Sequence, residues 1–130
     1  MQSLQVRTGQ ISLQILNDEG EVRGIFRFNP EDIESAKQVY RLQEELQVKE
    51  VEFEQQIKVA ETPQEKLDVL DNIVAYFNNS IDSCFGTGSS EILFGGAKTL
   101  SMYDDFFTGI VPYYEKASKA RVSKYKKSGK

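Results

Sequence analysis

The change of hydrophobic period at Asn29 constrains the fold of this chain most. Before it, apolar residues such as Ile11, Leu13 and Ile15 alternate with polar ones, which is the period of a strand buried on one face. After it, apolar residues recur every three, four or seven positions, as they do in amphipathic helices. A chain of 130 residues is expected to form one domain. We therefore predict a single α+β domain dominated by helices, in which an N-terminal antiparallel β-hairpin packs on about three of them.

The β-hairpin is predicted within residues 1–28. Segment 17–20 has the sequence Asn-Asp-Glu-Gly, which suits a hairpin turn because Asn and Asp bond their own backbone and Gly accepts a left-handed conformation. The strands flanking this turn are expected within about residues 10–28. Leu4 and Val6 also alternate with polar residues and can add a third strand. Gly24 lets a helix approach closely or, equally well, marks a bulge.

Two helix-start patterns divide the next segment, residues 29–85. Asn29, followed by Pro30, is predicted to cap a helix that runs to about residue 60. Thr62 and Glu65 form a capping-box pattern that starts a second helix, which Gly86 ends. Because the break between them is short, we expect two antiparallel helices.

A seven-residue repeat marks one face of the first predicted helix. Val39, Leu46 and Phe53 recur at this spacing, which is also the spacing of a coiled-coil seam. We favour an antiparallel pair within the chain over a coiled-coil dimer, because Lys49 and Gln56 occupy positions that would complete the seam.

Glycines cluster in residues 86–100, which we predict to be a loop. Phe85 and Phe94 are expected to hold this loop on the core while its tip stays mobile. The Gly-Thr-Gly-Ser-Ser sequence could cradle a phosphate, but no strand precedes it, so a structural loop is favoured. A final helix is expected over residues 101–125, followed by a basic tail over residues 126–130.

Charge is distributed unevenly along the chain. Residues 1–114 carry 9 Lys or Arg and 19 Asp or Glu, a net charge of −10, whereas residues 115–130 carry 7 and 1, a net charge of +6. The acidic body argues against a grip on nucleic acid. The basic end is interpreted either as a solvated tail or as a contact for an acidic partner, through Lys119, Lys124, Lys126 and Lys127.

Few residues of this chain suit catalysis. It contains no histidine, and Cys84 is its single cysteine, so we expect a buried structural thiol and no internal disulfide. Paired carboxylates such as Asp104 and Asp105 are explained by a helix start. We expect no enzyme, no catalytic residue, no metal and no cofactor. Neither a signal peptide nor a stretch of about 20 apolar residues is apparent, so a cytoplasmic protein without a membrane span is expected.

Residues 81–114 resemble a known family. The segment 81–90 (Ile-Asp-Ser-Cys-Phe-Gly-Thr-Gly-Ser-Ser), with Leu93-Phe94-Gly95 and the aromatic helix from Tyr103 to Tyr114, is similar to small tail proteins of long-tailed phages. The type concerned is the tail assembly chaperone of siphovirus-type phages and prophages of Gram-positive bacteria. The order of an N-terminal strand pair, an acidic helical middle and a lysine-rich end is also similar.

The resemblance implies a non-enzymatic function. Proteins of that family bind the long hydrophobic tape-measure protein, keep it soluble during tail assembly, and are thought to leave as tail tube subunits polymerise. It implies a homo-oligomer in the cytoplasm of the bacterial host, with the tape-measure protein, and possible contact with the tail tube protein, as partners. The residues expected to bind the partner are Val39, Leu46, Phe53, Phe85, Phe94, Phe106 and Tyr113.

Two other classes of function compete with this one. A structural component of the tail or of the head–tail connector would remain in the particle, and it predicts more β-structure than this sequence indicates. A small helical adaptor or nucleic-acid-binding regulator would use the basic C-terminus, and it predicts a salt-sensitive complex.

Overall fold

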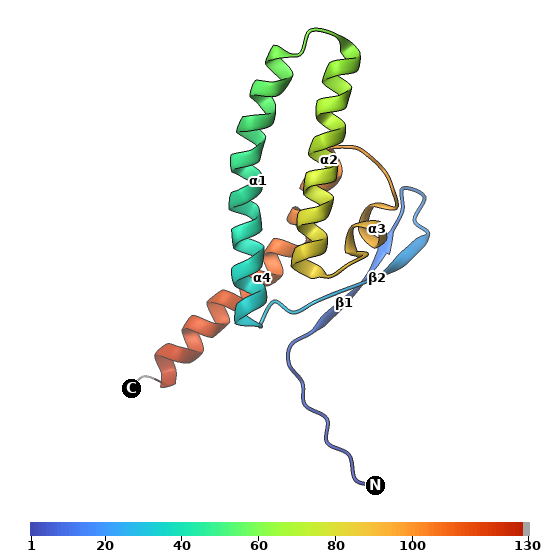
Figure 1. Ribbon diagram of the computed structural model, residues 1–130. Coiled ribbons are helices and arrows are strands. Elements are labelled where there is room, and N and C mark those ends of the chain that lie inside the picture. The colour runs from blue at the N-terminus through green and yellow to red at the C-terminus, as the bar shows by residue number, and fades with distance from the viewer. Residues whose placement is uncertain (129–130) are drawn as a thin grey trace.

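The fold is α+β, as the sequence predicts. The computed structural model describes the backbone of residues 1–128 and side chains through Lys124. Two strands are followed by four helices (Figure 1). In chain order they are β1 (Ile11–Leu16), β2 (Val22–Phe28), α1 (Ile33–Val59), α2 (Pro63–Phe85), α3 (Ser89–Phe94) and α4 (Ser101–Ser128).

The predicted β-hairpin is confirmed. β1 and β2 pair antiparallel, with Leu13 opposite Phe26, and the Asn17 side chain closes the turn by accepting hydrogen bonds from the Glu19 and Glu21 amides at 3.0 and 2.9 Å. The register shifts by one residue beside Ile15, so β2 carries a bulge. A third strand does not form among the described residues, because residues 1–10 extend away from the sheet.

Both readings of Gly24 are correct. It lies next to the bulge, and a Cβ built on it would be 3.1 Å from Cγ2 of Ile92 in α3. The helix that approaches Gly24 is α3, which lies within the segment predicted to be a loop.

The predicted cap of α1 at Asn29 is wrong. The helix begins at Ile33, and Asp32 caps it by accepting a hydrogen bond from the Ser35 amide at 2.8 Å. Asn29 instead accepts from the Glu31 and Asp32 amides at 3.0 and 3.2 Å. Such a local side-chain turn competes with the helix for the same backbone groups, which delays the helix start by one turn.

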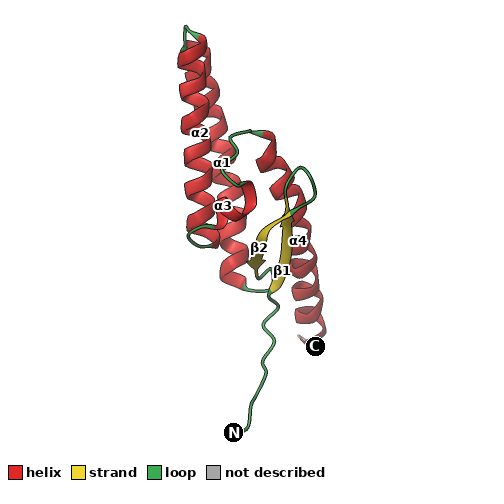
Figure 2. Ribbon diagram, turned by 90° about the vertical axis from the view of Figure 1, so that its right-hand side faces the viewer, coloured by secondary structure: helices red, strands yellow, loops and turns green. Residues whose placement is uncertain are grey.

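α1 and α2 form the predicted antiparallel pair, and its tip projects beyond the rest of the molecule (Figures 1 and 2). Thr62 caps α2 by accepting from the Glu65 amide at 3.1 Å. The Glu65 carboxylate reaches back to the amide of Glu61, at 2.8 Å, one residue beyond the usual capping-box partner.

The prediction of a loop over residues 86–100 is wrong in its middle, where α3 forms. Gly86 ends α2 with a φ of 113°, and Gly88 turns the chain with a φ of 91°. The Asp82 carboxylate then accepts from the Ser90 amide at 2.8 Å, and Ser89 is buried. This corner is therefore a helical turn held by a side-chain hydrogen bond, in place of the predicted loop.

The last helix extends beyond its predicted end. α4 continues through the predicted boundary between residues 125 and 126 as far as Ser128. Residues 129–130 of the predicted basic tail lie outside the described part of the chain.

An aromatic cluster joins the sheet to the helices. Phe26 packs edge-on against Phe85 and Phe106, with ring centroids 5.1 and 5.7 Å apart. Tyr114 of α4 is fully buried, and its hydroxyl group lies 2.8 Å from the Ser35 hydroxyl of α1. The core therefore lies where the sheet, α2, α3 and the first half of α4 meet, and it continues between α1 and α2 as far as Phe53.

Candidate partner-binding surface

Most of the residues that the sequence suggested for partner binding lie in the core. Phe85 is half-buried, and only Tyr113 is exposed, by 37%. The remaining five are buried: Val39, Leu46, Phe53, Phe94 and Phe106. In this fold these five side chains hold the domain together and present no free apolar surface.

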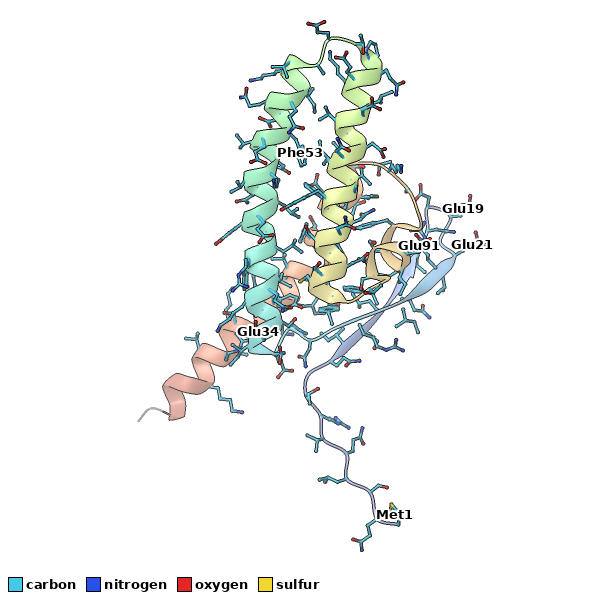
Figure 3. The ribbon with its side chains drawn as sticks, in the orientation of Figure 1. Met1, Glu19, Glu21, Glu34, Phe53 and Glu91 are labelled. Atoms are coloured by element: carbon cyan, nitrogen blue, oxygen red, sulfur yellow. The ribbon has the colours of Figure 1, made fainter. Side chains whose placement is uncertain are left out.

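The seven-residue repeat of α1 faces α2. Phe53 lies between the two helices (Figure 3), and its ring centroid is 6.2 Å from that of Tyr76 in α2. α2 contributes Val74 and Phe77 to the same core. The sequence predicts this pairing, but the seven-residue spacing alone does not show which face of either helix stays exposed and able to bind a partner.

Other apolar side chains are exposed on or beside the helical pair, and none of them is among the residues predicted to bind a partner. Val48 and Val51 stand on the outer side of α1 among acidic residues, and Val59 lies near the tip. Leu67, on α2, is 58% exposed, and Leu100, just before α4, is also exposed. The one sequence pattern that could have indicated these exposed residues is the position of Val48 and Val51 within an otherwise acidic face.

Leu67 and Leu100 line one groove, which we call the α2 groove. It has a volume of about 440 Å³. Lys98 pairs with Asp71 across 2.7 Å, which places the α3–α4 connection beside α2. The residues lining the groove are Gln64, Leu67, Asp68, Leu70, Asp71, Val74, Lys98 and Leu100. An apolar floor is thus bordered by two carboxylates and one ammonium group.

The basic residues of α4 divide into two kinds. The Arg121 guanidinium donates to the carbonyl oxygens of Pro30 and Glu31, at 3.1 and 3.3 Å, and so ties α4 to the start of α1. Lys119 and Lys124 are exposed. The side chains of Lys126 and Lys127 lie outside the described part of the chain.

Cys84 has the environment of a structural thiol. It is half-buried, and burial raises its pKa to about 11, so the thiol is almost entirely protonated near neutral pH. A thiol nucleophile needs the opposite shift. Among the side chains that the structure describes, no group of three or more His, Cys, Asp or Glu is placed to hold a metal ion.

Comparison with known proteins gives one family. A family model described as a family of unknown function (DUF6673) matches residues 24–130. The chain belongs to this family. The DUF6673 match begins inside β2, at the glycine on which α3 packs, and covers all four helices, including the corner at Gly86. It leaves out residues 1–23, which contain β1. No curated protein and no solved structure matches the chain. No helix in the described part is long and apolar enough to cross a membrane.

Proposed function

We propose that this protein is a tail assembly chaperone of a siphovirus-type phage or prophage, and that it binds a helical segment of the tape-measure protein in the α2 groove. It acts without catalysis, in the cytoplasm of the bacterial host. The observation that carries this proposal is an exposed apolar groove on a projecting helical pair, in a chain whose residues 81–114 resemble that family.

The groove suits an amphipathic helix. Leu67, Leu70 and Leu100 offer an apolar floor for the side chains of such a helix, which bind at three- and four-residue spacing. Asp68 stands at its border and favours basic residues flanking the apolar stripe. Leu67 and Leu100 are both exposed and line the same groove, and adjoining exposed apolar side chains of this kind are typical of a surface that binds a partner.

The position of the groove also supports the proposal. The tip of the α1–α2 pair projects from the body, so a long partner can pass along α2 without meeting the sheet (Figure 2). The first part of the segment that carries the resemblance, residues 81–95, forms the corner between α2 and α3, where Asp82 accepts a hydrogen bond from the Ser90 amide. We assign this corner a supporting role, because α3 begins the connection that brings Leu100 to the groove.

Co-expression with a tape-measure protein tests the proposal. We expect the native chain to keep that protein soluble and to form a complex with it on size-exclusion chromatography. Leu67→Asp should abolish the complex. Val59→Asp is the matched control, because Val59 is 77% exposed on the same helical pair but does not line the groove.

The outcomes separate the competing functions. Equal loss of binding in both variants, or no effect of either, would contradict the assignment of the groove. Failure of the native chain to solubilise the tape-measure protein, together with its presence in finished particles, would favour a structural tail component. A complex with DNA that weakens steeply with salt would favour a nucleic-acid-binding regulator.

A further inference from the structure

The first seven residues form an extended arm. Their sequence alternates as in a strand, but the arm is not part of the two-stranded sheet. Leu4 and Val6 alternate with polar residues and are 87% and 70% exposed. Met1, at the far end, lies well away from the body (Figure 3). Seven extended residues span about 23 Å at about 3.3 Å each, which is long enough to reach a neighbouring molecule.

The base of the arm is fixed in a direction away from the sheet. The Asn29 side-chain amide donates to the Thr8 carbonyl oxygen at 2.9 Å. Gly9 has a φ of 98°, and a Cβ there would lie 2.5 Å from Oε2 of Glu31. This hydrogen bond and the close packing of Gly9 on the Glu31 side chain hold the base beside the chain that follows β2. The outer edge of β1 lies on the other side of β1, so the arm does not fold back onto it without losing them.

That outer edge is unprotected. Among the described strands β1 pairs with β2 alone, and it contains neither a proline nor a charged residue, the usual means of shielding an edge. A two-stranded sheet is marginal by itself. β1 therefore has the features of a strand that accepts another.

An apolar groove adjoins this edge, and we call it the β1 groove. It lies between the hairpin and the first half of α4 and has a volume of about 370 Å³. Its apolar lining includes Leu13, Ile15, Met102, Phe106 and Gly109. No atom lies within 4 Å of a Cβ built on Gly109, so this wall leaves room for an incoming side chain.

We propose that the arm of one copy of this chain adds as a third strand to β1 of a second copy, with Leu4 and Val6 in its β1 groove. Alternation places both side chains on one face of the added strand. Arg7 is the only charged side chain among the first 17 residues. The groove is lined by two carboxylates, Asp18 and Asp105, and by Arg23, whose guanidinium already donates to the Leu93 carbonyl oxygen at 2.9 Å. The lining therefore has a net negative charge, which complements Arg7. Backbone pairing gives affinity and the groove gives specificity. This assembly does not depend on what the α2 groove binds.

Light scattering coupled to size-exclusion chromatography tests the arm. The native chain is expected to elute at a multiple of its 14.8 kDa mass. A double variant, Leu4→Asp with Val6→Asp, should elute as a monomer. The matched control, Ser3→Asp with Gln5→Asp, adds the same charge to the opposite face of the arm and should assemble as the native chain does.

A second variant tests the acceptor without touching the arm. Gly109→Leu fills the β1 groove from a position where the side chain has space, so the protein should fold with an unchanged or higher Tm and yet elute as a monomer. Persistence of the assembly in this variant or in the Leu4/Val6 double variant would overturn the proposal.

Mixed labelling distinguishes exchange between copies from folding back within one chain. A spin label is attached to Ser3→Cys in a Cys84→Ser background, and this chain is mixed with an unlabelled, ¹⁵N-enriched copy. We expect broadening of the amide signals of Gln14 and Gly109 in the ¹⁵N-enriched copy. Broadening only when label and isotope share one chain, with a monomeric mass, would show that the arm pairs with its own sheet and would refute the exchange.

Discussion

Replacing Asp82 with Ala should loosen the corner between α2 and α3 by a predictable amount. Its carboxylate accepts the Ser90 amide at 2.8 Å, and a hydrogen bond to a charged acceptor contributes about 1.5–3 kcal/mol. Two effects oppose this loss. Ala gains about 0.6 kcal/mol over Asp in helix propensity, and removing a negative charge from the last turn of α2 gains about 0.3–1 kcal/mol. The net cost expected in the free energy of unfolding is about 1 kcal/mol.

Urea denaturation measures this cost, and hydrogen exchange locates it. The Ser90 amide should lose most of its protection in Asp82→Ala and retain part of it in Asp82→Asn, which keeps an oxygen acceptor. Asp68→Ala is the matched control, since it makes the same change on an exposed part of α2. Equal stability of Asp82→Ala and Asp68→Ala, with an unchanged Ser90 amide, would refute the role assigned to Asp82.

Two further substitutions and one chemical modification probe the core. Gly24→Val should cost about 1–3 kcal/mol in urea denaturation, because even a Cβ there lies 3.1 Å from Ile92; Ile92→Ala should restore part of this loss, and no coupling between the two would contradict the close packing. Tyr114→Phe should cost about 1 kcal/mol, and its effect should be less than additive with Ser35→Ala if the 2.8 Å hydrogen bond is the cause. Cys84 has a pKa raised from 9.0 to about 11, so its alkylation at pH 8 should be about 100-fold slower in the folded than in the urea-unfolded chain, and the folded rate should keep rising with pH up to about 11. Equal rates in the two states would show that the thiol is not shielded.

The sequence predicted those features that depend on neighbouring residues. Alternation around segment 17–20 predicted the hairpin, and Thr62 and Gly86 predicted where α2 begins and ends. α3 was missed because its first-turn partner, Asp82, lies in the preceding helix and not at the N-cap position, where Gly88 has no side chain to offer. The glycine-rich segment 86–100 was therefore predicted to be a loop throughout.

The candidate surface was harder to predict than the fold. Seven-residue spacing identified Val39, Leu46 and Phe53 as one face of α1, but the same spacing serves packing within a chain and between chains. Leu67 and Leu100 are 33 positions apart, and contacts between distant residues, such as Lys98 with Asp71 and Tyr103 with Asn78, bring the α3–α4 connection onto α2. Patterns among neighbouring residues cannot predict contacts between positions so far apart in the sequence.

The hairpin is synthesised well before α4, the last helix that packs on its apolar face. The apolar face of the hairpin is covered by α4, where Tyr114 stacks on Phe28 at 5.9 Å between ring centroids. At about 5–20 residues per second, roughly 4–17 s separate the synthesis of these two residues. During that interval Phe28 lacks its partner Tyr114, and Phe26 lacks Phe106, although Phe85 of α2 is already available to pack on Phe26. A product that stops before Ser101 would leave the part of this face that α4 covers exposed, and we expect such a fragment to aggregate or to be degraded.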